Sequence, residues 1–210
     1  MRYNCLFLLI SLLSVSCANG QDNTSCEEAH VEYIQDQNKT FADPEESPLL
    51  KKALKGFKYV NYYPYDSKYC VTAQLVLTPG EEPFEMPTST DRLPVYVKYG
   101  ELHFVIDGVD LKLAVYQSLR LMEEEGYEDY LFVPFNDLTN GDTSYGAGRF
   151  FDFRIPEDGT YQLNLNNTYH PLCAYNHKYS CPLPPEENML DVAIEAGVRL
   201  GINGKSKMKH

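Results

Sequence analysis

The chain has 210 residues, of which 30 are acidic and 18 are basic, and its formal net charge at pH 7 is -12. This acidic excess excludes charge-driven binding to nucleic acid or to anionic lipid surfaces, because both require a basic protein face. With 43% apolar residues, a mature chain of roughly 190 residues predicts one domain with a substantial core.

The N-terminus has the pattern of a secretory signal peptide. Arg2 precedes an apolar run from Cys5 to Leu13 that only Ser11 interrupts. This run is shorter than the roughly 20 apolar residues that a membrane-spanning helix needs, and small residues follow it. No later apolar run reaches that length, so we expect an exported protein without a transmembrane helix.

Two processing sites fit this signal, and both place the signal and lipobox region in residues 1–20. The segment Ser14-Val15-Ser16-Cys17 resembles a bacterial lipobox. Lipidation of Cys17 would hold the protein on an envelope membrane, in the periplasm, by its lipid anchor alone. The alternative is cleavage after Gly20, which follows the small residues that signal peptidase reads and would release a soluble secreted protein.

An even number of cysteines remains after processing at either site, namely Cys26, Cys70, Cys173 and Cys181. In an oxidising compartment this number favours disulfides. We expect Cys173 to pair with Cys181, because they are close in sequence and a turn separates them, and Cys26 to pair with Cys70. Two alternatives for Cys173 and Cys181 are functional thiols and a zinc site with His170 and His177. The expected disulfide would remove two zinc ligands, so we predict neither a metal nor a cofactor.

Two short helices are expected near the N-terminus. Ser25 and Glu28 form a capping-box pattern, and apolar residues follow at helical spacing up to Phe41. Ser47-Pro48 predicts the start of the second helix, since proline is favoured at the first helical position, and Gly56 ends it.

From Tyr69 onward the apolar residues alternate with polar ones, as in strands. Asp107-Gly108 between the apolar runs 102–106 and 109–115 predicts a hairpin. We also expect a buried strand over 130–135, a second hairpin joining 151–155 to 161–165, and a last strand over 190–196. The fold class is therefore mainly β, an antiparallel barrel or sandwich preceded by two short helices. Its single domain spans residues 21–200, and residues 201–210 form a basic tail that we expect to be disordered.

The loop over residues 136–149 carries reactive side chains directly after a buried strand. Arg149 could clamp an anion with its planar fork, while Asp137 and Tyr145 orient it or exchange a proton. The alternative is a turn in which Asp137 and Thr139 cap their own backbone. We expect Arg149 to be partly buried and to pair with Asp137 or Asp152. A closed pair would be a structural strut, and a pair in an open cleft would be an anion receptor.

The loop over residues 170–188 contains Cys173 and Cys181 together with two further polar candidates, Tyr175 and Asn176. In a barrel or sandwich, both loops would lie at one end and could form a cleft. The candidate ligand-binding residues are therefore Asp137, Thr139, Tyr145, Arg149, Tyr175 and Asn176.

An ordered series of short motifs carries a family resemblance. The motifs are Ser47-Pro48-Leu49, Asn61-Tyr62-Tyr63-Pro64, Met86-Pro87-Thr88-Ser89-Thr90, Phe132-Val133-Pro134-Phe135-Asn136-Asp137, Thr143-Ser144-Tyr145-Gly146-Ala147-Gly148-Arg149, Cys173-Ala174-Tyr175-Asn176 and Tyr179-Ser180-Cys181-Pro182-Leu183-Pro184-Pro185. Together they resemble the domain of unknown function 1684 family, from about Glu27 to Gly197. The resemblance implies a bacterial or archaeal origin and carries no established activity.

These observations predict an uncharacterised envelope protein whose β domain binds a small polar or anionic ligand. One alternative is an enzyme that acts on a small anionic or carbonyl substrate through Asp137, Tyr145 and Arg149. Another is a structural envelope lipoprotein without a ligand. The sequence identifies no protein partner.

Overall fold

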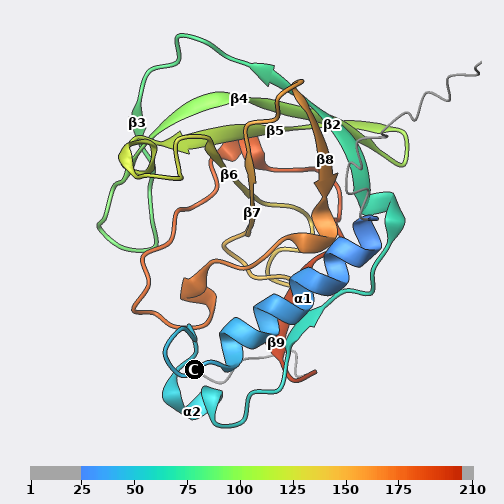
Figure 1. Cartoon of the computed structure of the whole chain (residues 1–210), viewed down its shortest axis with the longest axis vertical. Coiled ribbons are helices and arrows are strands. Elements are labelled where there is room, and N and C mark those ends of the chain that lie inside the picture. Colours follow the sequence, from blue (N-terminus) through green and yellow to red (C-terminus); the bar gives the residue numbers. More distant parts are fainter. Residues whose placement is uncertain (1–24, 205–210) are drawn as a thin grey trace, which may run out of the picture.

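A curled antiparallel sheet forms the upper half of the molecule, and helix α1 runs diagonally beneath it (Figure 1). The computed structural model describes residues 25–204. The predicted signal and lipobox region and most of the basic tail lie outside the described residues. The helices are α1 (Cys26–Ala42) and α2 (Lys51–Leu54). The strands are β1 (Val60–Tyr62), β2 (Cys70–Leu77), β3 (Phe84–Glu85), β4 (Val95–Ile106), β5 (Val109–Ser118), β6 (Tyr130–Phe135), β7 (Arg149–Arg154), β8 (Thr160–Asn164) and β9 (Val198–Ile202).

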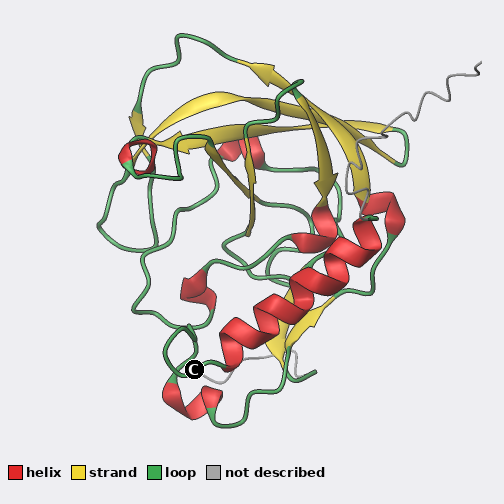
Figure 2. Cartoon of the chain, in the orientation of Figure 1, coloured by secondary structure: helices red, strands yellow, loops and turns green. Residues whose placement is uncertain are grey.

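The main sheet has the strand order β7-β6-β5-β4-β2-β8, and β3 pairs with β4. Its strong curl makes a half-barrel, which confirms the expected mainly β class with few helices (Figure 2). Strands β1 and β9 form a separate antiparallel pair next to α1. Within residues 25–204, no helix is both long and apolar enough to cross a membrane.

The predicted hairpin at Asp107-Gly108 is confirmed and becomes the long β4–β5 pair. Ile106 pairs directly with Val109, so the turn has two residues. Both have positive φ, 51° for Asp107 and 78° for Gly108. This conformation matches the twist of the two strands and explains why Asp-Gly is favoured there.

The second expected hairpin is wrong, because β7 and β8 do not pair with each other. β7 pairs with β6, and β8 pairs with β2, so they form the two ends of the strand order. The curl of the sheet brings these edges together, and the rings of Phe153 and Tyr161 stack at 4.3 Å between centroids. Residues 155–159 therefore cross from one edge of the half-barrel to the other.

The expected strand over residues 190–196 is also wrong. This segment is irregular, and the strand follows it as β9, which includes two residues that we had assigned to the tail. Leu190, Ile194 and Ala196 are buried in the main core. Burial explains the apolar pattern of the segment without a strand.

The first predicted helix is confirmed as α1, including the capping box between Ser25 and Glu28. The second is shorter than expected and begins at Lys51. Ser47 does not start it, because its hydroxyl donates a hydrogen bond to the Phe41 carbonyl oxygen at 2.7 Å. That bond closes the end of α1 instead.

The half-barrel encloses the main core, which includes Leu102, Leu113, Leu131, Val133, Phe135, Phe151 and Leu163. A second apolar cluster lies under α1 and contains Phe41, Leu49, Val60, Ala174, Tyr175 and Val198. The irregular loops that connect the sheet to β1 and β9 carry the side chains described next.

Candidate functional site

Arg149 and Asp137 form an ion pair in the interior of the protein. Arg149 Nη2 lies 2.5 Å from Asp137 Oδ2, and the two residues are 0% and 1% exposed. The guanidinium also donates to the carbonyl oxygens of Ala196 and Ile194. Asp137 accepts three further hydrogen bonds, from the peptide N–H and hydroxyl of Thr139 and from the peptide N–H of Ile194.

This arrangement makes Arg149 a strut that ties strand β7 and the 136–149 loop to the segment before β9. Burial lowers the pKa of Arg149, and the adjacent Asp137 carboxylate opposes that shift. The carboxylate and the two carbonyls replace most of the water that the cation loses. A pair that is closed off in this way matches the structural alternative for Arg149, because no ligand at the surface can contact it.

Tyr175 and Asn176 do not join Arg149 in an open cleft either. The Tyr175 ring is buried and packs edge-on against Phe41, with centroids 4.8 Å apart. Asn176 Oδ1 accepts a hydrogen bond from the peptide N–H of Lys178 at 3.1 Å and stabilises its own loop. Of the six predicted ligand-binding residues, Asp137, Thr139, Arg149 and Tyr175 are buried, and Tyr145 and Asn176 are half-buried.

His170 connects the two candidate loops. Its Nε2 accepts a hydrogen bond from the peptide N–H of Tyr145 at 3.1 Å. Burial and the nearby Arg149 charge lower the pKa of His170 to about 3, so the ring is neutral. Within residues 25–204, no group of three or more His, Cys, Asp and Glu side chains comes together as a metal site. His170 is held by Tyr145 and does not join the cysteines.

The four cysteines of the described chain are in two different states. The expected disulfide between Cys26 and Cys70 is confirmed, and it ties the start of α1 to the start of β2. The expected disulfide between Cys173 and Cys181 is not formed, and both residues are free thiols. The Cys181 sulfur instead accepts a hydrogen bond from the peptide N–H of Cys173 at 3.1 Å.

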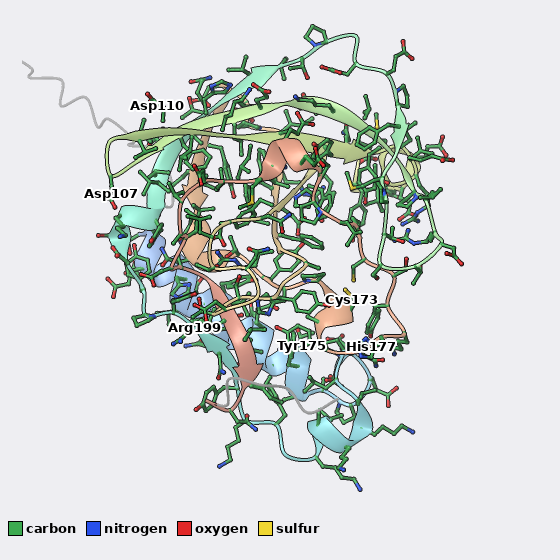
Figure 3. The ribbon with its side chains drawn as sticks, turned by 180° about the vertical axis from the view of Figure 1, so that it is seen from behind. Asp107, Asp110, Cys173, Tyr175, His177 and Arg199 are labelled. Carbon is green, nitrogen blue, oxygen red and sulfur yellow. A yellow bond between two sulfur atoms is a disulfide. The ribbon has the colours of Figure 1, made fainter. Side chains whose placement is uncertain are left out.

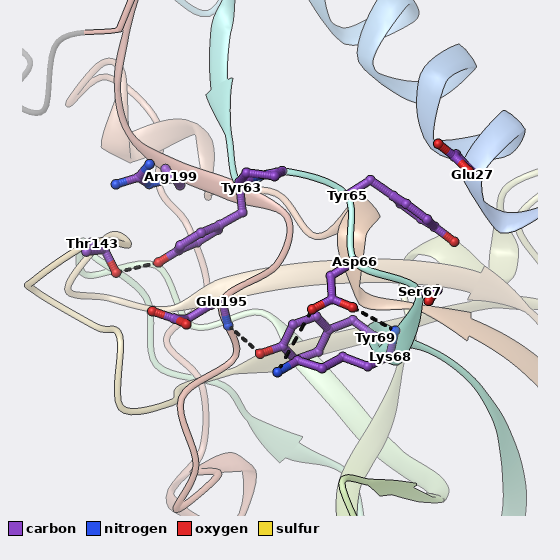
Figure 4. A pocket seen from close by; sticks show the side chains of 11 residues that line it. Glu27, Tyr63, Tyr65, Asp66, Ser67, Lys68, Tyr69, Thr143, Glu195 and Arg199 are labelled. Atoms are coloured by element: carbon purple, nitrogen blue, oxygen red, sulfur yellow. Dashed lines mark hydrogen bonds and ion pairs between the residues drawn. The ribbon is translucent and has the colours of Figure 1, made fainter.

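An open groove of about 680 Å³ lies on the surface between α1, the segment before β2 and the segment that leads into β9 (Figure 4). It is lined by aromatic and charged side chains from distant parts of the chain. They are Glu27, Tyr63, Pro64, Tyr65, Asp66, Ser67, Lys68, Tyr69, Thr143, Glu195 and Arg199. We call it the Arg199 groove.

Hydrogen bonds from the interior hold the walls of the Arg199 groove. Asn166 is buried, and its side chain contacts both the peptide N–H and the carbonyl of Asp66. The Tyr69 hydroxyl accepts a hydrogen bond from the peptide N–H of Glu195 at 3.1 Å. The Tyr65 ring lies 5.6 Å from the ring of His30 on α1. The groove is therefore formed by side chains that are already positioned.

Arg199 projects from β9 and is exposed. Its guanidinium lies 4.9 Å from the centre of the Tyr63 ring, a distance typical of a cation–π contact. The Tyr63 hydroxyl hydrogen-bonds to the Thr143 hydroxyl. Among residues 25–204, no carboxylate lies within ion-pair distance of the Arg199 guanidinium. Arg199 and Thr143 also line a second hollow of about 500 Å³, so the guanidinium stands between two openings.

Gly197 lets two backbone segments approach each other closely just before β9, and this approach positions the strand. Gly197 has φ of +75°, and a side-chain carbon there would lie 1.9 Å from the Thr168 hydroxyl. Its carbonyl accepts a hydrogen bond from the peptide N–H of Tyr63 at 2.9 Å. Glycine therefore allows the turn before β9 to bring Arg199 beside Tyr63.

Sequence reasoning missed Tyr63, Tyr65, Lys68 and Arg199 as site residues. The alternation Val198-Arg199-Leu200 is a signal that could have placed Arg199 on the exposed face of a strand. Of the 136–149 loop that was predicted to carry the site, Thr143 is the residue that reaches the groove. It does so because its carbonyl accepts a hydrogen bond from the peptide N–H of Leu200 at 2.9 Å.

The fold and the groove define a small half-barrel β domain with a polar, aromatic-walled surface site. The chain belongs to the family described as "Protein of unknown function (DUF1684)", whose model matches residues 55–199. The matched range includes the groove residues from Tyr63 to Arg199 and leaves out Glu27.

A solved structure has a similar fold. The chain is similar to an uncharacterised protein from Haloarcula marismortui whose structure was determined by solution NMR, with 31% sequence identity and a TM-score of 0.65. The similarity covers 85% of this chain and 96% of that one. No curated protein matches this chain.

Proposed function

We propose that the protein binds a small, singly charged anionic ligand with several hydroxyl groups in the Arg199 groove. The observation that carries this proposal is the exposed Arg199 guanidinium, which lies over the Tyr63 ring without a carboxylate partner among the described residues. A guanidinium presents a planar fork of donors that fits a carboxylate or a phosphate oxygen pair.

The other charged residues of the groove limit how much negative charge the ligand can carry. Glu27, Asp66 and Glu195 line the same groove as Arg199 and Lys68. Lys68 already lies 3.9 Å from Asp66 and 3.4 Å from Asp107, so its charge is partly compensated. Three carboxylates would repel a ligand with several negative charges, but they can accept hydrogen bonds from hydroxyl groups.

The aromatic walls favour a ligand with an apolar face. Tyr65 is half-buried and stands at the edge of the groove with its ring beside α1 (Figure 4). Aromatic rings contribute contact area at low entropic cost and combine it with a polar hydroxyl. Sugar acids combine a singly charged carboxylate, hydroxyl groups and an apolar C–H face, so they are the compounds to test first.

Thermal-shift measurements with glucuronate, gluconate, glucose 6-phosphate and citrate test this proposal. Saturation with a ligand at one hundred times its Kd stabilises a protein by about 2.7 kcal/mol, which raises Tm by several degrees. We expect a sugar acid to raise Tm, and we expect glucose 6-phosphate and citrate, which carry more negative charge at neutral pH, to have less effect. If no compound of this class raises Tm, the proposal fails.

Variants of Arg199 show whether the effect comes from the groove. Arg199→Gln should abolish the shift, and Arg199→Lys should retain part of it because the charge remains and the fork is lost. Arg154→Gln is a matched control, since Arg154 is also exposed and lies over the rings of Tyr127 and Tyr130 but lines neither hollow. A shift that survives in Arg199→Gln would place the ligand elsewhere.

A further inference from the structure

Cys173 and Cys181 form a pair of neighbouring thiols away from the Arg199 groove. Figure 3 shows Cys173 and Arg199 at well-separated positions. Both thiols are free, and their residues are 5% and 7% exposed. The Cys181 sulfur accepts a hydrogen bond from the peptide N–H of Cys173 at 3.1 Å, and the two thiols are also hydrogen-bonded to each other.

The backbone on both sides of the pair is held in place. Cys181 lies in an extended segment that is hydrogen-bonded to Ser89 in both directions, through the Ser89 peptide N–H at 2.9 Å and through its hydroxyl at 3.1 Å. Cys173 lies in the 3₁₀ turn Leu172–Ala174, which the peptide N–H of Asn176 closes onto the Leu172 carbonyl. Each of the two sulfurs is therefore carried by a segment whose backbone is held by hydrogen bonds.

The surroundings of the two sulfurs are unequal. Hydrogen bonds from the Cys181 thiol and from the hydroxyls of Ser89 and Tyr145 lower the pKa of Cys173 to about 6, against the opposing effect of burial. The hydrogen bond to Cys173 and burial raise the pKa of Cys181. These contacts thus favour the thiolate at Cys173 over the thiolate at Cys181, and thiolates are the reactive form of cysteine.

Cys173 is also close to solvent. Of the two hydroxyl groups at its sulfur, Ser89 belongs to an exposed residue and Tyr145 to a half-buried one. The side chains that contact the Cys173 sulfur on this side are therefore themselves exposed to solvent, at least in part.

We propose that Cys173 and Cys181 form a reactive dithiol site that exchanges with small organic disulfides, with Cys173 as the attacking sulfur and Cys181 as the resolving sulfur. The site requires neither Arg199 nor the groove, so its test is independent of the proposed ligand.

The exchange has two steps. In the first, the Cys173 thiolate attacks one sulfur of the organic disulfide, a mixed disulfide forms, and the released thiolate takes up a proton. In the second, Cys181 loses its proton, its sulfur attacks the Cys173 sulfur, and the second organic thiolate leaves and is protonated. In total, the two cysteines lose two electrons, Cys181 and the solvent each supply one proton, and the organic disulfide becomes two thiols.

Oxidised glutathione is the probe that tests this site in the purified, folded protein. After exposure at neutral pH, the protein is quenched in acid, alkylated and analysed peptide by peptide, so that Cys5 and Cys17 are scored separately. We expect a Cys173–Cys181 disulfide to form and to be reversed by reduced glutathione, while the Cys26–Cys70 disulfide stays oxidised throughout. Cys173 and Cys181 that react only after denaturation would overturn the proposal. A Cys173–Cys181 disulfide that reduced glutathione cannot open in the folded protein would overturn it as well, because the bond would then be structural.

Two variants test the order of attack. Cys181→Ser should accumulate a glutathione adduct at Cys173, because the resolving sulfur is missing. Cys173→Ser should form an adduct at Cys181 at least about tenfold more slowly at pH 7, because burial disfavours the Cys181 thiolate and the hydroxyl donors of Ser89 and Tyr145 lie at the Cys173 sulfur. Equal rates in the two variants, with circular dichroism spectra that match the parent, would contradict the assigned roles.

Discussion

Arg149 Nη2 lies 2.5 Å from Asp137 Oδ2, and the two side chains have no exposed surface. This pair connects the loop after β6 to the irregular segment before β9, whose carbonyls accept further hydrogen bonds from the cation. The residue that looked most like an anion receptor in the sequence is therefore engaged by the protein itself. The surface arginine beside the groove, Arg199, is the one that remains for a ligand.

Removing one member of the buried pair should destabilise the fold strongly. We expect Arg149→Met to lower the free energy of unfolding by about 3–5 kcal/mol, because it leaves the Asp137 carboxylate buried without a cation. The double variant Arg149→Met with Asp137→Leu should recover part of that loss. Urea denaturation measures both. Arg154→Met is the control on an exposed arginine and should change stability by less than about 0.5 kcal/mol. An Arg149→Met variant whose free energy of unfolding is nearly unchanged would contradict the structural role of Arg149.

Stability should fall in acid through His170. The pKa of His170 is lowered to about 3 in the folded state from an ordinary value of 6.5. Between these values the unfolded chain binds a proton that the folded chain does not, so the free energy of unfolding decreases as the pH falls. From pH 6.5 to 4.5 this contribution amounts to about 2 kcal/mol.

His170→Gln removes that titration while it keeps a group that can accept the Tyr145 peptide N–H. We therefore expect the variant to lose less stability than the parent over the same pH range, as measured by urea unfolding at each pH. Parallel pH profiles for the two proteins would show that His170 is not the group that titrates.

Tyr145→Phe should make Cys173 less reactive near neutral pH. The Tyr145 hydroxyl is one of the donors that lower the pKa of Cys173, so its removal should move the midpoint of the pH–rate profile upward. Iodoacetamide alkylation of the native protein, followed at the Cys173 peptide, measures this midpoint. Tyr179→Phe is the control, since Tyr179 lies in the same loop and should leave the midpoint in place. A downward shift in Tyr145→Phe would rule out the donor role.

Much of the fold could be predicted where the signal is local. The capping box at Ser25 and the Asp107-Gly108 turn each specify their own backbone hydrogen bonds, and both are present in the structure. The partners of β7 and β8 depend instead on how far the sheet curls, which no local pattern encodes. The apolar segment 190–196 resembled a strand because burial selects apolar residues whether or not the backbone forms a ladder.

The candidate site could be predicted only in part for a similar reason. Thr143 and Cys173 were found in loops that the sequence marks clearly. The groove residues, by contrast, come from α1, the segment 63–69, one loop and β9, and they meet only after folding. Whether Arg149 or Arg199 faces solvent depends on tertiary packing, since both lie at the start of a strand and precede apolar residues.

Membrane attachment remains a proposal, because Cys17 lies outside the described residues. We expect Cys17→Ala to abolish lipid labelling and to move the protein from the membrane fraction to the soluble periplasmic fraction in a bacterial host. Without Cys17 the lipid cannot be attached, and stable anchoring requires several acyl chains. Unchanged fractionation of the variant, with the parent already soluble, would favour cleavage after Gly20.

Amide chemical-shift mapping with the best compound of the thermal-shift panel tests the proposed binding site most directly. If the ligand occupies the Arg199 groove, saturable shifts should concentrate in residues 63–69, at Thr143 and in residues 195–199, and they should disappear in Arg199→Gln. Saturable shifts centred on another part of the described chain, and unchanged in Arg199→Gln, would contradict the proposed function.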